Sequence, residues 1–460
     1  MIRPLGVYLA AIAALAAGCS AAPPRAARDG KRQQHQAQQI RNVSVTVIDG
    51  DLLRRVPGAL VRIGPHAARS DAHGVATMPL RHHVLLPVYV SRRGYAPKTA
   101  RVQFRRGPRA AVRIYQPVLQ WPMYGVSPSR TQAQTAIRLR PPFRIIWSRG
   151  FGNLIEFPAV VADGLAYISN HDGTVRAISM RTGRIAWRRD TRGAMMAASP
   201  AVVGDELVVH GMDGHVWVLD RRSGLIRWRF TIGSPVESSP VVSDGVDYFG
   251  SWNGRVYALD LATRRLRWVR DFGAKITSSA ALAGNRVYVG DYGGRILALS
   301  RRTGRALWSG SMNGRIYGTP AVSGGRVFVP SSDGNSMTAF STSGRLLWRV
   351  NTGSYVYSSP AVWAGRVFFG SYNGSFYCVS ASSGRSLWTV GAGGSVSGAA
   401  VVVDGVAYAG SFGHEIVGVD AGSGRVVLRF PHGGYVPVTG NGGILLMHGF
   451  SRIFAVKARP

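Results

Sequence analysis

A tryptophan recurs along most of this chain at a nearly constant interval of 40 or 41 residues. The seven members of the series are Trp147, Trp187, Trp228, Trp268, Trp308, Trp348 and Trp388. Leu428 occupies the next place in the series. Self-similarity at a fixed period of this length is typical of repeat architectures, in which neighbouring copies cover one another's apolar faces. The series therefore predicts a repeat fold for most of the 460 residues.

Each copy has the pattern of four short strands. In one copy, the strand-like segments are residues 239–242, 246–250, 256–260 and 265–268. The second and third strands are joined by residue pairs that accept positive φ, as two-residue hairpins require. In successive copies these pairs are Asp172-Gly173, Asp213-Gly214, Asn253-Gly254, Gly293-Gly294, Asp333-Gly334 and Asn373-Gly374. Four antiparallel strands per copy predict one propeller blade per copy.

The number of copies predicts an eight-bladed β-propeller over residues 143–460. The copies begin near residues 157, 199, 239, 279, 319, 359 and 398, and an eighth begins near Tyr435. The eighth copy stops one strand short, whereas residues 143–147 supply an extra strand ahead of the first copy. Joining that strand to the last blade closes the ring without an open edge. A content of 58 glycines with only 17% charged residues also favours an all-β protein with many tight turns.

The N-terminus has the features of a signal peptide over residues 1–18. Arg3 carries a positive charge, residues 5–17 form an apolar run, and small residues precede Cys19. The run is shorter than the roughly 20 residues that a membrane-spanning helix needs. The small residues before Cys19 resemble the bacterial lipobox, which implies a lipidated Cys19 and an extracytoplasmic, membrane-anchored lipoprotein. Residues 19–41 are polar and rich in Ala, Pro, Arg and Gln, which predicts a flexible tether.

Residues 42–116 predict a small β-sandwich ahead of the repeats, because short alternating segments are separated by turn residues. Residues 57–63, 70–76 and 88–95 resemble domains of the carboxypeptidase-regulatory type, which implies a spacer or adhesion module without chemistry of its own. Its histidines have no recognised metal-ligand spacing, so we expect no metal site here. They are His66, His73, His82 and His83. Residues 117–142 are interpreted as a lead-in linker to the propeller.

The repeats resemble a known family of propellers. The phrase before each tryptophan, such as residues 298–308, is similar to the tryptophan-docking motif of PQQ-type propellers, and residues 121–125 resemble the lead-in of that family. The quinoprotein dehydrogenases belong to this family of propellers. Resemblance to them implies a PQQ cofactor bound with calcium, an acidic base and a pair of adjacent cysteines. Cys19 and Cys378 are the only cysteines of this chain and are not adjacent.

The BamB-like lipoproteins share the same propeller, and their resemblance implies a lipid-anchored scaffold that presents propeller loops to partner proteins. We therefore expect a non-catalytic envelope scaffold, monomeric, without catalytic residues or cofactor. Two alternatives stay open, a ligand-sensing propeller and a PQQ-dependent dehydrogenase, because a fold alone does not give a function.

The charge balance points to anionic surroundings. With 56 Lys and Arg against 22 Asp and Glu, the net charge is +34, which should attract acidic envelope polymers or lipid headgroups. No basic run interleaved with stacking aromatics marks a nucleic-acid track, so we expect no nucleic-acid partner. Envelope proteins or anionic envelope polymers are the expected partners, with the membrane reached through the lipid anchor.

The loops that lead into the innermost strands predict a binding site. These strands surround the central channel of a propeller, so their leading loops should ring one mouth. The position three residues before proline in the Ser-Pro step holds acidic or aromatic residues in several copies, although Ile155 takes it in the first. Tyrosines beside cations suit an adaptable contact surface, and solvated loop residues without a partner are the alternative. The predicted binding mouth comprises Glu237, Lys275, Arg315, Tyr317, Tyr355 and Tyr357.

Overall fold

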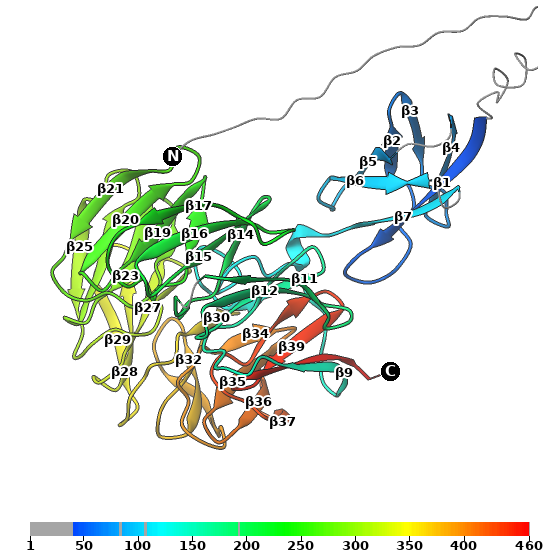
Figure 1. Cartoon of the computed structure of the whole chain (residues 1–460). Helices are drawn as coiled ribbons and strands as arrows, with labels where there is room; N and C mark the ends of the chain where they lie inside the picture. The colour runs from blue at the N-terminus through cyan, green and yellow to red at the C-terminus, as the bar shows by residue number, and fades with distance from the viewer. Residues whose placement is uncertain (1–39, 82–84, 105–107, 192–193, 460) are drawn as a thin grey trace, which may run out of the picture.

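The computed structural model describes residues 40–81, 85–104, 108–191 and 194–459. Strands dominate these residues, which confirms the all-β prediction, and a short 3₁₀ helix, η2 (Pro117–Leu119), joins two parts of the chain. In Figure 1 the smaller, blue and cyan part lies beside a larger ring of green to red sheets. The predicted signal peptide, Cys19 and most of the predicted tether lie outside the described residues.

The smaller part is a sandwich of two sheets. One sheet has the order β4-β1-β7 and the other β3-β2-β5-β6. Alternation along β1 buries Val43, Val45 and Val47 in the core between the sheets, because successive side chains of a strand point to opposite faces. The strands are β1 (Ile40–Asp49), β2 (Leu60–Ile63), β3 (His66–Arg69), β4 (Val75–Arg81), β5 (Leu85–Ser91), β6 (Lys98–Gln103) and β7 (Arg109–Ile114).

The larger part is a β-propeller of eight sheets. In each sheet the chain begins at the innermost strand and proceeds outward, but in the last sheet the outermost strand, β9, comes from the start of the propeller sequence. The first four blades are β10 (Val160–Ala162), β11 (Leu165–Ser169), β12 (Thr174–Ser179) and β13 (Ile185–Asp190); β14 (Ala201–Val203), β15 (Glu206–His210), β16 (His215–Asp220) and β17 (Ile226–Thr231); β18 (Val241–Ser243), β19 (Val246–Gly250), β20 (Arg255–Asp260) and β21 (Arg265–Asp271); β22 (Ala281–Ala283), β23 (Arg286–Gly290), β24 (Arg295–Ser300) and β25 (Ala306–Ser311).

The last four blades follow the same order, except that β8 is a fifth strand of the seventh blade and β9, from earlier in the chain, is the outermost strand of the eighth. They are β26 (Ala321–Ser323), β27 (Arg326–Ser331), β28 (Ser336–Ser341) and β29 (Leu346–Asn351); β30 (Ala361–Trp363), β31 (Arg366–Gly370), β32 (Ser375–Ser380) and β33 (Ser386–Gly391); β34 (Val401–Val403), β35 (Val406–Ser411), β36 (Glu415–Asp420) and β37 (Val426–Pro431), with β8 (Ala133–Gln134); β38 (Val438–Asn441), β39 (Ile444–His448), β40 (Arg452–Ala458) and β9 (Phe143–Gly150).

The ring closes between β9 and β40. These strands pair antiparallel, with Trp147 opposite Ala455 and Phe143 opposite Ala458. The strand that precedes the first blade therefore completes the last one, as the sequence predicts. The red end of the chain lies against the teal strand β9 in Figure 1.

Tryptophan indoles bond most blades to the next one. The Trp268 indole N–H of the third blade donates to the Arg301 carbonyl in a turn of the fourth at 3.0 Å, and Trp187 reaches Arg221 O in the same way at 3.0 Å. A Cβ on Gly304, whose φ is +70°, would lie 2.5 Å from the Trp268 ring. Glycine is therefore required where the turn meets the indole. Arg264 replaces this glycine in the third blade, and its guanidinium lies over the Trp228 ring instead.

The repeated serines of the Ser-Pro steps link neighbouring blades around the channel. The Ser239 N–H donates to Ser279 Oγ at 2.9 Å, and the Thr319 N–H donates to Ser359 Oγ at 2.9 Å. Each hydroxyl therefore satisfies a backbone donor that faces the channel, where an unpaired N–H would be costly. This explains in structural terms why the step recurs in blade after blade.

Residues 121–134, here called the strap, run across the innermost strands at one end of the channel. Trp121 pairs with Val161 of the first blade, and Gln132 O accepts from the Val402 N–H of the seventh at 2.9 Å. Strap carbonyls also accept from Val202, Leu282, Val322 and Val362. The lead-in segment is therefore an integral part of the ring, because it bonds to six of its blades.

Arg130 of the strap is buried at the centre of the ring, with 1% of its surface exposed. Its guanidinium donates to Ala280 O at 2.9 Å, to Ser239 O at 3.0 Å and to Pro240 O at 2.9 Å, and also to Tyr124 O. Burial lowers the pKa of Arg130 to about 10. The side chain joins the third and fourth blades to the strap through carbonyl oxygens.

We expect Arg130→Leu to lower the free energy of unfolding by about 3 kcal/mol, because buried carbonyl oxygens lose their donors. Urea unfolding followed by tryptophan fluorescence measures this change. The control is Arg138→Leu, whose side chain is 74% exposed and touches Asp404 at 3.5 Å. Equal unfolding midpoints for the two variants would contradict the role given to Arg130.

Candidate functional site

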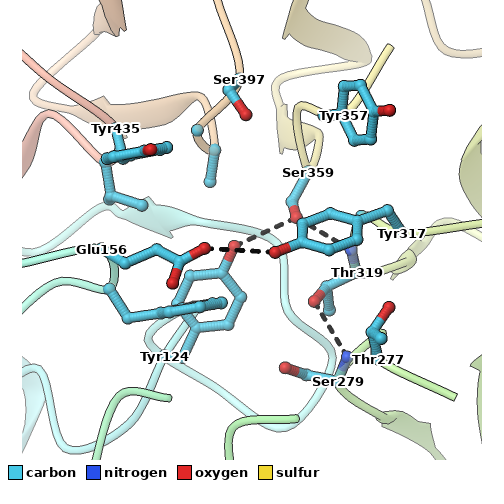
Figure 2. A pocket seen from close by; sticks show the side chains of 15 residues that line it. Tyr124, Glu156, Thr277, Ser279, Tyr317, Thr319, Tyr357, Ser359, Ser397 and Tyr435 are labelled. Atoms are coloured by element: carbon cyan, nitrogen blue, oxygen red, sulfur yellow. Dashed lines mark hydrogen bonds between the residues drawn. The ribbon is translucent and has the colours of Figure 1, made fainter. Parts of the chain in front are cut away.

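The candidate site is the mouth of the channel, at the end where the chain enters the innermost strands. A cavity opens there, and its floor is Tyr124 of the strap, whose hydroxyl donates to Ser359 Oγ at 3.1 Å (Figure 2). Phe157 packs on Tyr124 edge to face, with ring centroids 5.7 Å apart. The cavity is thus closed below by an aromatic floor and open at the mouth.

Two carboxylates from different blades meet at one tyrosine. The Tyr317 hydroxyl donates to Glu237 Oε1 at 2.8 Å and lies 3.2 Å from Glu156 Oε1, as Figure 2 shows for Glu156. The Trp252 indole N–H donates to Glu237 Oε2 at 2.8 Å. On its other side, Glu156 lies 2.9 Å from His171 Nε2. These contacts hold an acidic pair in place at the mouth.

The pKa values reflect this arrangement. Burial raises the pKa of Glu237, while the hydrogen bonds from Tyr317 and Trp252 oppose the shift. Burial also raises the pKa of Tyr317 well above its usual range, and the charges of Glu156 and Glu237 add to the effect. The Tyr317 hydroxyl therefore keeps its proton and remains a donor at neutral pH.

Two cations flank the acidic pair. The Lys275 ammonium lies 3.3 Å from the centroid of the Trp252 ring and 4.9 Å from that of Tyr292. Arg315 lies over the other side of Tyr292 at 5.8 Å and forms an ion pair with Asp333 at 2.8 Å. Cation–π contacts of this kind fix the position of a charge while leaving it near solvent.

A chain of aromatic rings continues around the rest of the mouth. Neighbouring centroids lie 5.1–6.3 Å apart, and several contacts have the edge-to-face geometry that aromatic pairs prefer. Three of the rings are well exposed, namely Tyr355 at 47%, Phe412 at 37% and Phe450 at 47%. We call this surface the aromatic arc; it comprises Tyr317, Tyr355, Tyr357, Tyr372, Phe412, Tyr435 and Phe450.

The structure brings all six residues of the predicted mouth to this end of the channel. Glu237 and Tyr317 are bonded to each other, and Lys275 lies on the indole that binds Glu237. Tyr355 and Tyr357 belong to the aromatic arc, with their rings 5.9 Å apart. Arg315 is held by Asp333, a contact between side chains of neighbouring turns that the repeat alignment does not predict.

Other residues of the mouth were not predicted from the sequence. The alignment on the Ser-Pro step selects Ile155, which is buried, whereas its neighbour Glu156 lines the cavity. Four aromatics stand immediately before the hairpin pairs that join the second and third strands, and this shared position could have identified them. They are Trp252, Tyr292, Tyr372 and Phe412.

Among the described residues, no group of three or more His, Cys, Asp or Glu side chains could hold a metal ion. In the same part of the chain, no helix has both the length and the apolar character needed to cross a membrane. Cys378 of β32 is buried, and burial raises its pKa to about 12.

Comparison with known proteins identifies the family of the repeats. The family described as outer membrane protein assembly factor BamB matches residues 144–273, 252–355 and 338–442, which together span most of the ring. The chain belongs to this family.

Individual relatives match shorter stretches. BamB of Taylorella asinigenitalis is 33% identical over 92 residues, which are 18% of this chain and 24% of that protein. A quinoprotein ethanol dehydrogenase of Pseudomonas putida is 29% identical over 83 residues, which are 18% of this chain and 13% of that protein. The chain thus matches about a quarter or less of the length of these two relatives.

Solved structures with the same fold include members of both groups. BamB from Moraxella catarrhalis aligns with 69% of this chain and all of its own, at a TM-score of 0.59 and 17% identity. Quinohemoprotein alcohol dehydrogenase from Comamonas testosteroni aligns with 74% of this chain and 81% of its own, at a TM-score of 0.64 and 14% identity. Likeness at this level of identity establishes the propeller fold.

We expect Tyr317→Phe to raise the pKa of Glu237 further, because the carboxylate loses a hydrogen bond that stabilises its charged form. Carbon-detected NMR titration of the glutamate carboxyls measures the shift. Tyr357→Phe is the matched control, since the Tyr357 hydroxyl has no carboxylate partner among the described residues. An unchanged Glu237 titration in Tyr317→Phe would contradict the contact.

Proposed function

We propose that this protein is a non-catalytic, lipid-anchored scaffold of the cell envelope whose propeller mouth binds a partner protein. The aromatic arc is the observation that carries the proposal. Exposed aromatic rings with a cation beside them are typical of the centres of protein interfaces, where large rigid side chains supply contact area at low entropic cost. The family description, an outer membrane protein assembly factor, supports a protein partner in the envelope.

The direction in which the mouth faces supports the same function. Each innermost strand runs from the mouth to a turn at the opposite end of the ring, and in the first blade that turn holds Gly164. The sandwich domain contacts this opposite end, where Tyr115 lies against Gly164. The described residues of the sandwich therefore lie at the end away from the mouth, which supports a mouth that is available to a partner.

The alternative of a PQQ-dependent dehydrogenase has less support. PQQ carries three carboxylates, so its binding site needs cations that face the cofactor. Among the described residues that line the central cavity, none is Lys or Arg, and Glu156 contributes a negative charge. The Tyr317 hydroxyl is already engaged by Glu237 and Glu156. These side chains do not fit the cofactor, which favours the scaffold over the enzyme.

We expect replacement of the exposed rings of the aromatic arc to abolish partner binding. Tyr355→Ser combined with Phe412→Ser and Phe450→Ser should reduce recovery of the partner from cross-linked envelopes by more than about tenfold, because such rings dominate interface energetics. Quantitative mass spectrometry of the captured proteins measures recovery, and the melting temperature should not change.

The control for this experiment removes comparable apolar surface elsewhere. Leu307→Ser, Leu346→Ser and Leu387→Ser together change side chains that are 48%, 51% and 39% exposed on the outermost strands β25, β29 and β33. Equal recovery with the two triple variants would show that the aromatic arc is not the binding surface.

The proposed anchor is tested separately. We expect Cys19→Ser to move the protein from the membrane fraction to the soluble fraction, since acylation of this residue is the proposed attachment. Fractions are washed at high salt, which screens any attraction between the net charge of +34 and anionic lipids. Retention of the variant after this wash would refute the lipid anchor.

A further inference from the structure

A second cavity, of about 170 Å³, lies where the sandwich meets the propeller. We call it the junction cavity. Arg113 and Tyr115 line it from the sandwich side, Arg181 from the turn between β12 and β13, and Lys457 from β40. Side chains from the sandwich, the first blade and the last blade thus converge on one space, although they are far apart in the sequence.

The three cations of the junction cavity are unpaired. Within the described ranges, the side chains of Arg113, Arg181 and Lys457 have neither a hydrogen bond nor an ion pair. Lys98 adds to the positive field, since its ammonium lies over the Tyr115 ring at 5.0 Å. Burial lowers the pKa of Lys98; the charge of Asp163 opposes this shift, and neighbouring arginines, Arg113 among them, add to it.

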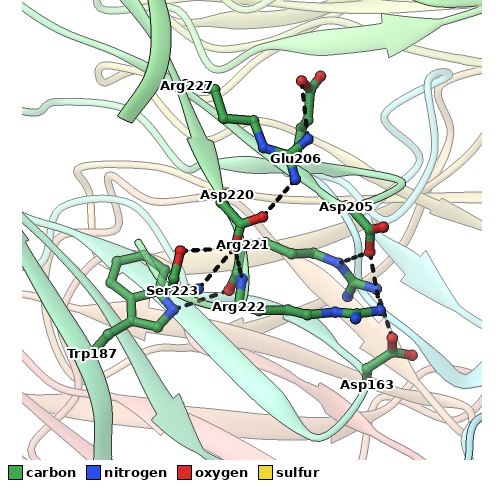
Figure 3. A network of polar contacts seen from close by, with 9 residues as sticks. All are labelled: Asp163, Trp187, Asp205, Glu206, Asp220, Arg221, Arg222, Ser223 and Arg227. Carbon is green, nitrogen blue, oxygen red and sulfur yellow. Dashed lines mark hydrogen bonds and ion pairs between the residues drawn. The ribbon is translucent and has the colours of Figure 1, made fainter. Parts of the chain in front are cut away.

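Nearby arginines of the first two blades do have acidic partners. In the first two blades, Arg221 lies 2.7 Å from Asp163 Oδ2, and Arg227 of β17 lies 2.5 Å from Asp220 Oδ2 (Figure 3). The carboxylates of that region are therefore committed to other arginines. The cations of the junction cavity line an open space instead.

Tyr115 supplies a neutral donor in the same cavity. The residue is 8% exposed, and its hydroxyl lies so close to Gly164 that a Cβ there would be 2.6 Å away. Among the described residues this hydroxyl has no hydrogen-bond partner. Burial raises the pKa of Tyr115 to about 12, so the O–H remains available to donate at neutral pH.

One carboxylate also lines the cavity, but it is engaged elsewhere. Both Asp51 oxygens accept from Gln120 Nε2 at 3.0 Å, and Oδ2 also accepts from the Gln116 N–H at 3.1 Å. Asp51 thus fastens the sandwich to the η2 segment, and it forms no ion pair with the three cations. The cavity keeps an excess of positive charge.

We propose that the junction cavity binds a phosphoryl group, held by Arg113, Arg181 and Lys457 with the Tyr115 hydroxyl as a fourth donor. A guanidinium group can donate two parallel hydrogen bonds to two oxygens of a phosphate, and an ammonium group adds a compact positive charge. A tetrahedral group with several oxygens suits donors that converge from three elements better than a planar carboxylate does. The phosphoryl group belongs either to a soluble phosphate or to the headgroup of an anionic lipid.

The site is independent of the mouth, because it lies at the opposite end of the innermost strands. If the phosphoryl group belongs to a lipid, binding at the junction cavity turns the mouth away from the bilayer. A soluble ligand would instead hold the sandwich and the propeller together, since the cavity includes residues of both.

The test uses the full chain with Cys19→Ser, so that no acyl group contributes to binding. Isothermal titration calorimetry measures the binding of inorganic phosphate and of pyrophosphate. Flotation measures the binding of the protein to phosphatidylcholine vesicles with and without phosphatidylglycerol. The variant Arg113→Ala/Arg181→Ala/Lys457→Ala removes the three cations. The control Arg305→Ala/Arg345→Ala/Arg385→Ala removes the same charge from exposed turns of the fourth to sixth blades, whose side chains have no partner among the described residues.

The expected result is saturable binding that weakens at least about tenfold in the first triple variant and not in the control, as the loss of one or two charge-assisted hydrogen bonds predicts. Binding of phosphate with this dependence identifies a soluble source, and binding of phosphatidylglycerol vesicles alone identifies a headgroup. Equal losses in both triple variants, or no binding of either ligand, would overturn the proposal. If the first triple variant does not fold, the single variants Arg181→Ala and Arg305→Ala are compared. The proposal requires weaker binding in Arg181→Ala, and equal affinities would overturn the proposal.

Discussion

The contact between each tryptophan and the turn of the next blade determines the geometry on which the rest of this structure depends. The indole of Trp268 reaches Arg301 O, and Gly304 leaves room for the ring. A tryptophan buried or partly buried at seven junctions stabilises the ring by a few kcal/mol per blade, and Leu428 takes its place at the eighth. Because the same contact recurs around the ring, it fixes the angle between blades and brings residues from blades far apart in sequence to one mouth.

The strap fills the centre of the channel in the ring. A bare propeller encloses a channel that is open at both ends, but here Arg130 and Tyr124 occupy its centre. The Arg130 guanidinium has carbonyl oxygens rather than a carboxylate as partners, so the burial of its charge depends on the third and fourth blades being in place. Tyr124, two residues after Pro122, then forms the floor of the cavity at the mouth. Fold stability and the shape of the site are therefore linked through one segment.

The fold could be predicted from the sequence because the same pattern of strands and turns recurs in successive copies, most of them with a docking tryptophan. The site could be predicted only in part. Alignment on the Ser-Pro step found Glu237 and Tyr317, since both hold the same place in their copies, but it chose Ile155 over Glu156. A shift of one residue reverses which side chain faces the channel, and periodicity alone does not resolve it. The pairing of Arg315 with Asp333 and the burial of Arg130 depend on three-dimensional packing, for which the repeat pattern holds no signal.

The two ends of the propeller differ in chemistry. The mouth combines the Glu156 and Glu237 carboxylates with exposed aromatic rings and with Lys275 and Arg315, whereas the junction cavity holds cations without partners among the described residues. A net charge of +34 by itself would draw every face of the protein toward an anionic surface. At the mouth two carboxylates offset the charges of Lys275 and Arg315, while the carboxylate that lines the junction cavity, Asp51, forms no ion pair with its three cations. Because each innermost strand runs from one end to the other, the anion binding proposed for the junction cavity would set the direction in which the mouth is presented.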